Sequence, residues 1–180
     1  AAAGIEDPFA ELKRRENALA LRELPNVLRE IDAAPPLRRG ELLIRGLLAG
    51  NLFDMGSKAA VDAYASSSAA FDFAAMRGRL PARPWPIDDL DAWWNRPSAA
   101  SGCSRVEATP RPRPGALGPG APGGFAYRQV LFFVDNAGPD VILGAIPLAT
   151  VLAGRGARVV LAANSRPALN DVTAAELPLI

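Results

Sequence analysis

The chain has 180 residues, of which 49% are hydrophobic and 22% are charged, with a formal net charge of +1. This length and composition can bury a substantial core, most simply as one domain, alone or with a helical lobe. The near-zero net charge argues against a dedicated nucleic-acid surface. The absence of histidine excludes Ser-His-Asp triads, histidine acid-base catalysis and the usual zinc sites.

The sequence also bears on where the protein works. Its single cysteine, Cys103, cannot form an internal disulfide and suits a reducing compartment. The N-terminal Ala-Ala-Ala-Gly does not form a secretory signal, and no uninterrupted apolar run reaches the roughly 20 residues that cross a bilayer. We therefore expect a soluble, cytoplasmic protein with no membrane partner.

The N-terminal part predicts helices. Asp7-Pro8 is a favourable helix start, and apolar residues then recur at helical spacing as far as Leu24. We expect Pro25 to interrupt this helix and Asn26 to cap a second one before a proline turn at residues 34–36. The first helix is interpreted as an amphipathic scaffold.

Two later stretches also predict helices. One runs from Glu41, and its glycines, Gly46 and Gly50, would allow a neighbouring element to approach closely or mark an interruption. The other follows three acidic residues, which suit a helix start better than a second metal site because carboxylates complement the helix dipole. These three residues are Asp88, Asp89 and Asp91.

Asn51 and Asp54 are candidate ligand-binding residues. They are three positions apart, so on a continuing helix they share one face. Asn51 lies among large apolar residues, where burial of an amide is costly unless it has a partner such as a phosphate or a metal shell. The alternative for Asp54 is a local ion pair with Lys58.

A strand-helix-strand pattern organises the C-terminal part. Residues 130–134 are apolar, β-branched or aromatic, and predict a strand buried on both faces. Residues 141–152 predict an apolar helix closed by glycine, and residues 157–163 predict a second buried strand. The three elements form a right-handed βαβ unit with parallel strands.

Small polar residues follow both predicted strands. The carboxyl ends of parallel strands open on one edge of the sheet, where ligands of open α/β folds bind. Carboxylate and amide oxygens are ligands that suit magnesium or manganese. The alternative is local, because Asp and Asn also end strands and cap helices. The residues concerned are Asp135, Asn136, Asn164, Asn170 and Asp171.

Two stretches in this region, VDNAGPDVILGAIPLA and RVVLAANSRPALNDVT, resemble the metal-binding core of the damage-control phosphatase family, formerly a domain of unknown function. The resemblance is nearest to the branch of the plant members and the C-terminal domain of a vertebrate pantothenate-kinase homologue. Three upstream stretches resemble the same branch in the same order: DPFAELKRREN, RGLLAGNLFDMGSKA and RPWPIDDLD. The resemblance covers nearly the whole chain.

The resemblance implies an α/β fold in three parts. A helical lobe (residues 1–95) would precede a disordered Pro/Gly-rich insertion (residues 96–124) and the first βαβ unit (residues 125–180) of a Rossmann-like, three-layer sheet. Family members continue with further strands, so the chain is expected to be C-terminally truncated. The family also places a Glu-Asn pair, here Glu16-Asn17, near the active site, with a solvated charged helix face as the alternative.

The implied activity is a divalent-metal-dependent phosphatase of damaged or surplus phosphometabolites, with phosphopantetheine-like compounds or sugar phosphates as substrates. Asp135, Asn136 and Asp171 would hold Mn²⁺, Ni²⁺, Co²⁺ or Mg²⁺, and both aspartates would be catalytic. The alternative is a non-catalytic module that binds a metal or ligand. A dinucleotide site is disfavoured because the loop after the first strand lacks G-x-G-x-x-G spacing. Substrate contacts are expected from Asn51, Asp54, Asn164 and Ser165.

Overall fold

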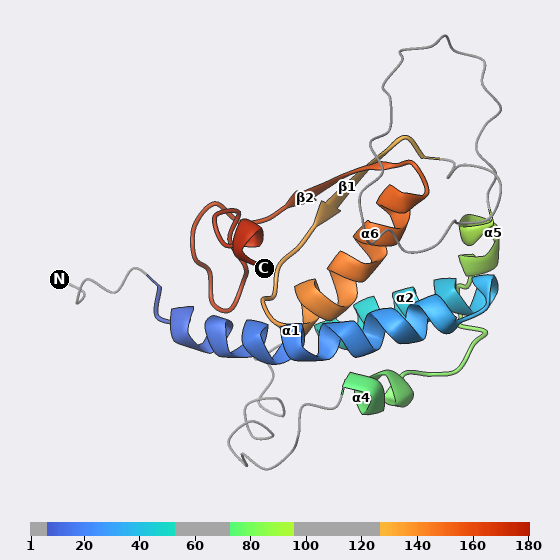
Figure 1. The fold of residues 1–180 in the computed structure, drawn as a ribbon, viewed down its shortest axis with the longest axis horizontal. Helices are drawn as coiled ribbons and strands as arrows, with labels where there is room; N and C mark the ends of the chain where they lie inside the picture. Colours follow the sequence, from blue (N-terminus) through green and yellow to red (C-terminus); the bar gives the residue numbers. More distant parts are fainter. Residues whose placement is uncertain (1–6, 53–72, 96–126) are drawn as a thin grey trace, which may run out of the picture.

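A computed structural model describes residues 7–52, 73–95 and 127–180 (Figure 1). The chain is mixed α/β, with helices first and two parallel strands later, as predicted. The predicted insertion at residues 96–124 and Asp54 lie outside the described residues. The elements are α1 (Ala10–Ala33), α2 (Pro36–Asn51), α4 (Phe73–Arg79), α5 (Leu90–Trp94), β1 (Gln129–Phe133), η1 (Asp140–Ala145), α6 (Ile146–Gly154), β2 (Arg158–Ala162) and η2 (Leu177–Leu179).

Helix α1 continues through Pro25, so the predicted interruption is wrong. Pro25 is exposed, whereas Val27 and Ile31 beyond it are buried in the core. Packing on both sides of the proline therefore outweighs the cost of about 3 kcal/mol that an interior proline brings. The helix start agrees better with the sequence, since Asp7 Oδ1 accepts the N–H of Phe9 at 2.9 Å, just before the first helical residue.

Helix α2 begins earlier than predicted, at Pro36, and packs closely on η1. An ideal Cβ placed on Gly50 would lie 2.6 Å from Asp140 Cα, and one on Gly144 would lie 3.0 Å from Leu47 Cα. Only glycine leaves room for backbones this close. The predicted close approach at the glycines of α2 is confirmed, and it brings α2 to the start of η1.

The predicted helix at residues 141–152 is present, but its first part is the π-helix η1, which α6 continues. Pro147 has no N–H to donate to the carbonyl one turn earlier, and its ring crowds that carbonyl. The wider π turn directly precedes this proline, where it accommodates the missing bond. Nearly all residues from 140 to 152 are buried, so this helix forms the centre of the core.

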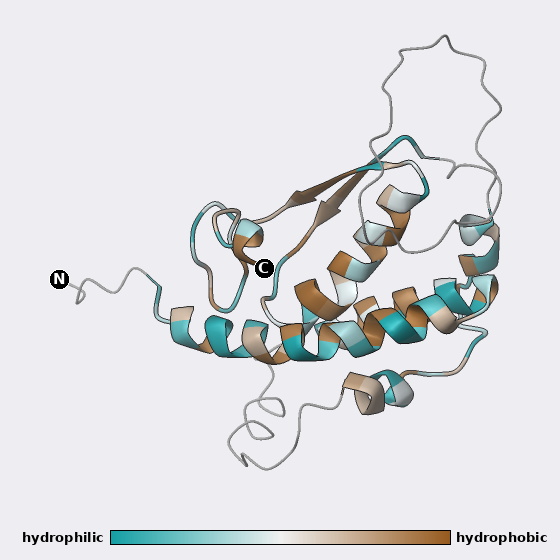
Figure 2. Ribbon diagram, in the orientation of Figure 1, coloured by the Kyte–Doolittle hydropathy of each residue, from teal (hydrophilic) through white to brown (hydrophobic). Residues whose placement is uncertain are grey.

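Strands β1 and β2 pair in parallel, in a register that places Gln129 opposite Arg158 and Phe133 opposite Ala162. One face of the pair packs against the core that contains α6. On the other face Leu131 and Phe133 are 54% and 78% exposed, so the prediction of strands buried on both faces is wrong for the described residues. Beyond their first residues, Gln129 and Arg158, both strands are hydrophobic (Figure 2), whereas the described helices cover one face of the pair.

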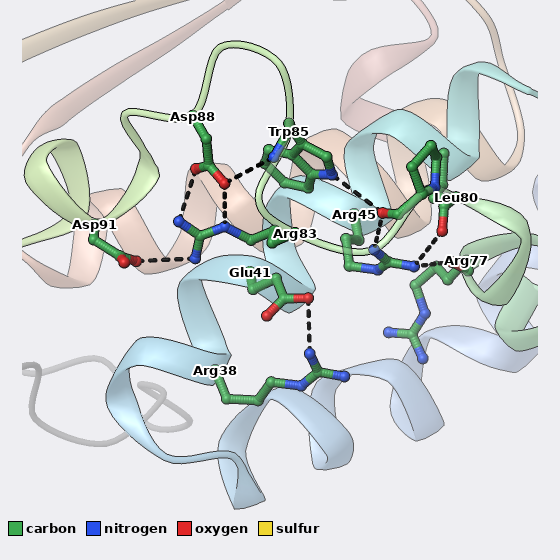
Figure 3. Close-up of polar contacts among 10 residues, drawn as sticks. Arg38, Glu41, Arg45, Arg77, Leu80, Arg83, Trp85, Asp88 and Asp91 are labelled. Carbon is green, nitrogen blue, oxygen red and sulfur yellow. Dashed lines mark hydrogen bonds and ion pairs between the residues drawn. The ribbon is translucent and has the colours of Figure 1, made fainter.

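Arg45 of α2 connects α2 to the C-terminal end of α4 (Figure 3). Its guanidinium donates to the carbonyl oxygens of Arg77, Leu80 and Pro81 at 2.6, 3.0 and 2.8 Å. The last carbonyls of a helix have no partner within the helix, so this arginine closes the C-terminal end of α4.

The acidic stretch before α5 binds an arginine. Asp88 accepts two hydrogen bonds from Arg83, both at 2.7 Å, and Asp91 accepts a third at 2.9 Å (Figure 3). Asp88 also accepts the N–H of Leu90, the first residue of α5, at 3.3 Å. The predicted helix start is confirmed. Within the described ranges, no helix has the length and apolarity required to cross a bilayer.

Candidate functional site

The segments that follow β1 and β2 pair with each other beyond the ends of the strands. Asn136 and Asp171 face each other in an antiparallel bridge. Next to this bridge the N–H of Val172 donates to the carbonyl of Asp135 at 2.6 Å. The backbone thus brings the Asp-Asn pair after β1 against the Asn-Asp pair that follows β2.

Three asparagine side chains form hydrogen bonds in this region, two of them to acids. Asn170 Nδ2 donates to Asn136 Oδ1 at 3.0 Å, and both side chains are buried. Asn164 Nδ2 donates to Asp171 Oδ2 at 2.6 Å. Asn136 Nδ2 points toward Asp140 Oδ2 at 3.5 Å. Two of these amides, Asn164 and Asn136, therefore contact carboxylates of the site directly.

Asp140, which sequence reasoning left without a role, lies at the first residue of η1 and is 7% exposed. Burial raises the pKa of its carboxyl to about 7, and a hydrogen bond and charge repulsion from the Asp135 carboxylate act in the same direction. An acid at the start of a helix is commonly a first-turn residue that complements the dipole. The sequence held no signal that this one is buried beside Asp135.

Helix α1 lies against the loop between β1 and η1. Asn17 Oδ1 accepts the N–H of Gly138 at 2.7 Å. Glu16 is 3% exposed, and burial raises its pKa to about 7. Gly138 has a φ of +72°, and an ideal Cβ there would lie 2.8 Å from Glu16 Cβ, so glycine is required. The Glu16-Asn17 pair is thus packed on this loop, and the alternative of a solvated charged face is wrong.

Lys13, one turn before Glu16-Asn17, is 1% exposed. Its Nζ lies 2.7 Å from Asp7 Oδ2 and 2.8 Å from Glu176 Oε1, and donates to the carbonyl of Asp171 at 3.2 Å. Burial lowers the pKa of Lys13, but the hydrogen bonds to the two carboxylates outweigh it and leave the pKa above its ordinary value. Sequence reasoning missed this residue, because lysine on a helix is normally exposed.

The predicted substrate-binding residues lie on different elements. Asn164 and Ser165 are exposed where the chain leaves β2. Asn51 is also exposed and ends α2, directly after the Gly50 that contacts Asp140, so its amide does not need the buried partner considered from the sequence. Within the described part of the chain, Asn51 makes no hydrogen bond to Asn164 or Ser165.

The chemistry of the site fits a hard divalent cation. Its available donors are carboxylate and amide oxygens, which magnesium and manganese prefer. Among the residues described, no group of three or more His, Cys, Asp or Glu side chains is arranged as a metal site. The residues predicted to bind a cation are two carboxylates, Asp135 and Asp171, and the amide of Asn136, and their backbones are paired. The charge of Lys13 is already matched by Asp7 and Glu176. A bound cation would therefore supply the positive charge that reduces repulsion among the remaining carboxylates of the site.

Comparison with known proteins connects this arrangement with a family. Residues 1–180 match the family described as "Damage-control phosphatase ARMT1-like domain". The chain is 41% identical over 172 residues to "Pantothenate kinase 2" of Arabidopsis thaliana, covering 96% of this chain and 17% of that protein. It is 37% identical over 170 residues to "4'-phosphopantetheine phosphatase" of Mus musculus, covering 94% and 18%.

A third relative is shorter. The chain is 35% identical over 179 residues to "Damage-control phosphatase At2g17340" of Arabidopsis thaliana, covering 97% of this chain and 40% of that protein. The chain thus spans 17% to 40% of the length of these relatives. The family match nevertheless extends over all residues of the chain, which therefore belongs to the ARMT1-like damage-control phosphatase domain family.

Proposed function

We propose that this chain forms part of a divalent-metal-dependent phosphatase that hydrolyses small phosphorylated metabolites. The observation that carries the proposal is the pairing of Asp135-Asn136 with Asp171 at the ends of two parallel strands. Family membership supports the reaction class. A phosphopantetheine-like compound is the first substrate to test, because the mouse relative is named a 4'-phosphopantetheine phosphatase. Sugar phosphates are the second.

In this proposal Asp135, Asn136 and Asp171 hold the cation. Mn²⁺, Mg²⁺, Ni²⁺ and Co²⁺ are the candidates, since oxygen donors dominate the site. When bound, the cation would neutralise negative charge on the phosphoryl group and favour in-line attack. Asp140 is a neighbour of Asp135: burial and the Asp135 carboxylate raise the pKa of the Asp140 carboxyl, which favours its protonated form, a hydrogen-bond donor.

Substrate contacts are proposed at the exposed mouth of the site. Asn164 uses one N–H for Asp171, and an amide has two, so the second can donate to a phosphate oxygen. The Ser165 hydroxyl lies next to it and is exposed. Asn51, at the exposed end of α2, and Asp54 remain candidates for contacts with the rest of the substrate.

The test is phosphate release from p-nitrophenyl phosphate and from 4'-phosphopantetheine in the presence of Mn²⁺. We expect Asp135→Asn to lower the rate by about 100-fold or more, because a cation ligand is lost. The matched control is Asp32→Asn, which removes an exposed carboxylate near the end of α1 and should leave the rate unchanged. No release by either protein would exclude a phosphatase activity for this chain, and equal release by wild type and Asp135→Asn would exclude the proposed role of Asp135.

A second candidate function is a module that binds the cation or ligand without turnover. Calorimetry would then detect Mn²⁺ binding by the wild type and its loss in Asp171→Asn, while neither protein releases phosphate.

A further inference from the structure

The first turns of α1 and the segment after β2 are far apart in sequence and adjacent in space. In Figure 1 the chain's last residues, drawn in red, return to the N-terminal half of α1, drawn in blue. Lys13 makes the connection, with hydrogen bonds to residues 158 and 163 positions later, Asp171 and Glu176. A helix that contributes none of the proposed cation ligands thus contacts the segment that carries one.

The ammonium of Lys13 has an acceptor for each of its three hydrogens. Asp7 and Glu176 supply carboxylates at 2.7 and 2.8 Å, and Asp171 supplies its backbone carbonyl at 3.2 Å. The Lys13 side chain is 2% exposed. A buried ammonium is tolerated when it is paired and hydrogen-bonded in this way, so the position of Lys13 and the positions of its acceptors depend on one another.

Glu176 extends the connection along the segment. Its carboxylate accepts the backbone N–H of Thr173 at 2.7 Å and the Thr173 hydroxyl at 2.9 Å. Thr-x-x-Glu is the capping-box spacing, in which the glutamate fixes the backbone three residues earlier. The segment from Asp171 to Glu176 is therefore held at both of its ends by one lysine on α1.

On the opposite side the same segment pairs with the end of β1. The Val172 N–H bonds to the Asp135 carbonyl at 2.6 Å, and the Ala137 N–H bonds to the Asn170 carbonyl at 3.0 Å. Asp171 thus lies between two constraints, Lys13 from α1 and the Asp135-Asn136 strand end. If the lysine contact is lost, the segment keeps its strand pairing and the bond from Asn164 to Asp171, but it loses its connection to α1.

We propose that Lys13 is a positioning residue, which holds Asp171 against Asp135-Asn136 and so sets the affinity of the site for a divalent cation. The part that concerns the cation rests on the proposed function. The charge of Lys13 and its positioning role predict opposite changes in cation affinity when the lysine is removed. An ammonium repels a cation, so by charge alone its removal would tighten cation binding. Loss of positioning would weaken binding instead.

The experiment compares Lys13→Met with Arg14→Met. Both remove one positive charge from adjacent positions of α1, but the Arg14 side chain is 74% exposed and pairs locally with Glu11. Calorimetry with Mn²⁺ should show binding about 10- to 100-fold weaker in Lys13→Met, as for groups that orient a metal ligand, and unchanged or slightly tighter in Arg14→Met.

Amide hydrogen exchange supplies a readout that needs no metal. In Lys13→Met the amides of Val172 and Ala137 should exchange faster. Their hydrogen bonds join the segment around Asp171 to the end of β1, and this segment is released from α1. The amide of Val134, which bonds to the Ala162 carbonyl at 2.9 Å in the neighbouring ladder, should keep its protection. Exchange at Val172 that is unchanged, or Mn²⁺ binding that is unchanged or tighter in folded Lys13→Met, would overturn the proposal.

Two further outcomes, a Lys13→Met variant that does not fold and a wild type that binds no Mn²⁺, require other measurements. Should Lys13→Met fail to fold, Glu176→Gln removes the ion pair but keeps an oxygen for Thr173, with exposed Glu11→Gln as its control. Faster Val172 exchange in Glu176→Gln supports the proposal, and unchanged exchange overturns it. Should the wild type bind no Mn²⁺, the proposed function fails, and exchange at Val172 alone decides the role of Lys13.

Discussion

At Gly50 a single hydrogen in place of a side chain sets how α2 meets the candidate site. An ideal Cβ at this position would lie 2.6 Å from Asp140 Cα and 3.1 Å from the carbonyl oxygen of Pro139. Both of these neighbours are backbone atoms at the start of η1, which cannot rotate away. The packing of α2 thus helps to determine where Asp140 stands relative to Asp135.

We predict that Gly50→Ala lowers the free energy of unfolding by about 1–3 kcal/mol, as expected when a methyl group is forced into a filled space. Urea denaturation measures the effect. The matched control is Gly78→Ala in α4, where an added Cβ meets no atom within 4 Å. There alanine should be neutral or stabilising by about 0.5–1 kcal/mol, because glycine is unfavourable in a helix. Equal effects of the two substitutions would contradict the close contact.

At the scale of elements, the turn that leads into α5 depends on Arg83 and Asp88. Hydrogen bonds from Arg83 lower the pKa of the Asp88 carboxyl to about 2, and the Asp88 side chain is 8% exposed. A carboxyl with a lower pKa in the folded state stabilises the fold above its unfolded pKa, and this contribution is lost as the pH falls through the folded pKa.

The expected result is a pH-dependent difference between wild type and Asp88→Asn. The wild type should be more stable by a constant amount above about pH 5, and the difference should shrink as the pH falls from about 4 toward 2. Urea denaturation over this pH range gives the measurement. Asp89→Asn, at the exposed neighbouring residue, is the control for losing a carboxylate from the same turn. A difference that stays constant down to pH 2.5 would show that the pKa of Asp88 is not lowered.

At the scale of the whole molecule, two phenylalanines occupy opposite environments. Phe73 of α4 is 1% exposed and belongs to the core, whereas Phe133 at the end of β1 is 78% exposed on the open face of the sheet. Their side chains are identical, so the difference in their contributions to stability reflects only where the fold places them.

We expect Phe73→Ala to lower the free energy of unfolding by about 3–5 kcal/mol, the usual cost of emptying a core position occupied by phenylalanine. Phe133→Ala should cost less than about 1 kcal/mol, because an exposed side chain loses little buried area. Urea denaturation of both variants, with light scattering to monitor association, provides the comparison. Similar losses would mean that the open sheet face is covered in solution.

The sequence by itself determined the elements that follow simple periodicity. Parallel strands, the apolar helix between them and the acidic start of α5 are local patterns, and each is present. Position relative to a strand end is also local information and drew attention to five polar residues, from which the resemblance to the family selected Asp135, Asn136 and Asp171. The exception is Pro25, where the local signal for an interruption lost to packing along α1.

The tertiary structure alone decided which charged residues are buried around these strand ends. Lys13 and Glu16 look like an exposed helix face, and Asp140 looks like a first-turn acid, because the residues that bury them are distant in the chain. Asn17 meets its partner 121 positions later, and Lys13 meets Glu176 163 positions later. Burial of a charge depends on such contacts, since its cost is offset only by partners that folding brings near, and a local pattern carries no record of them.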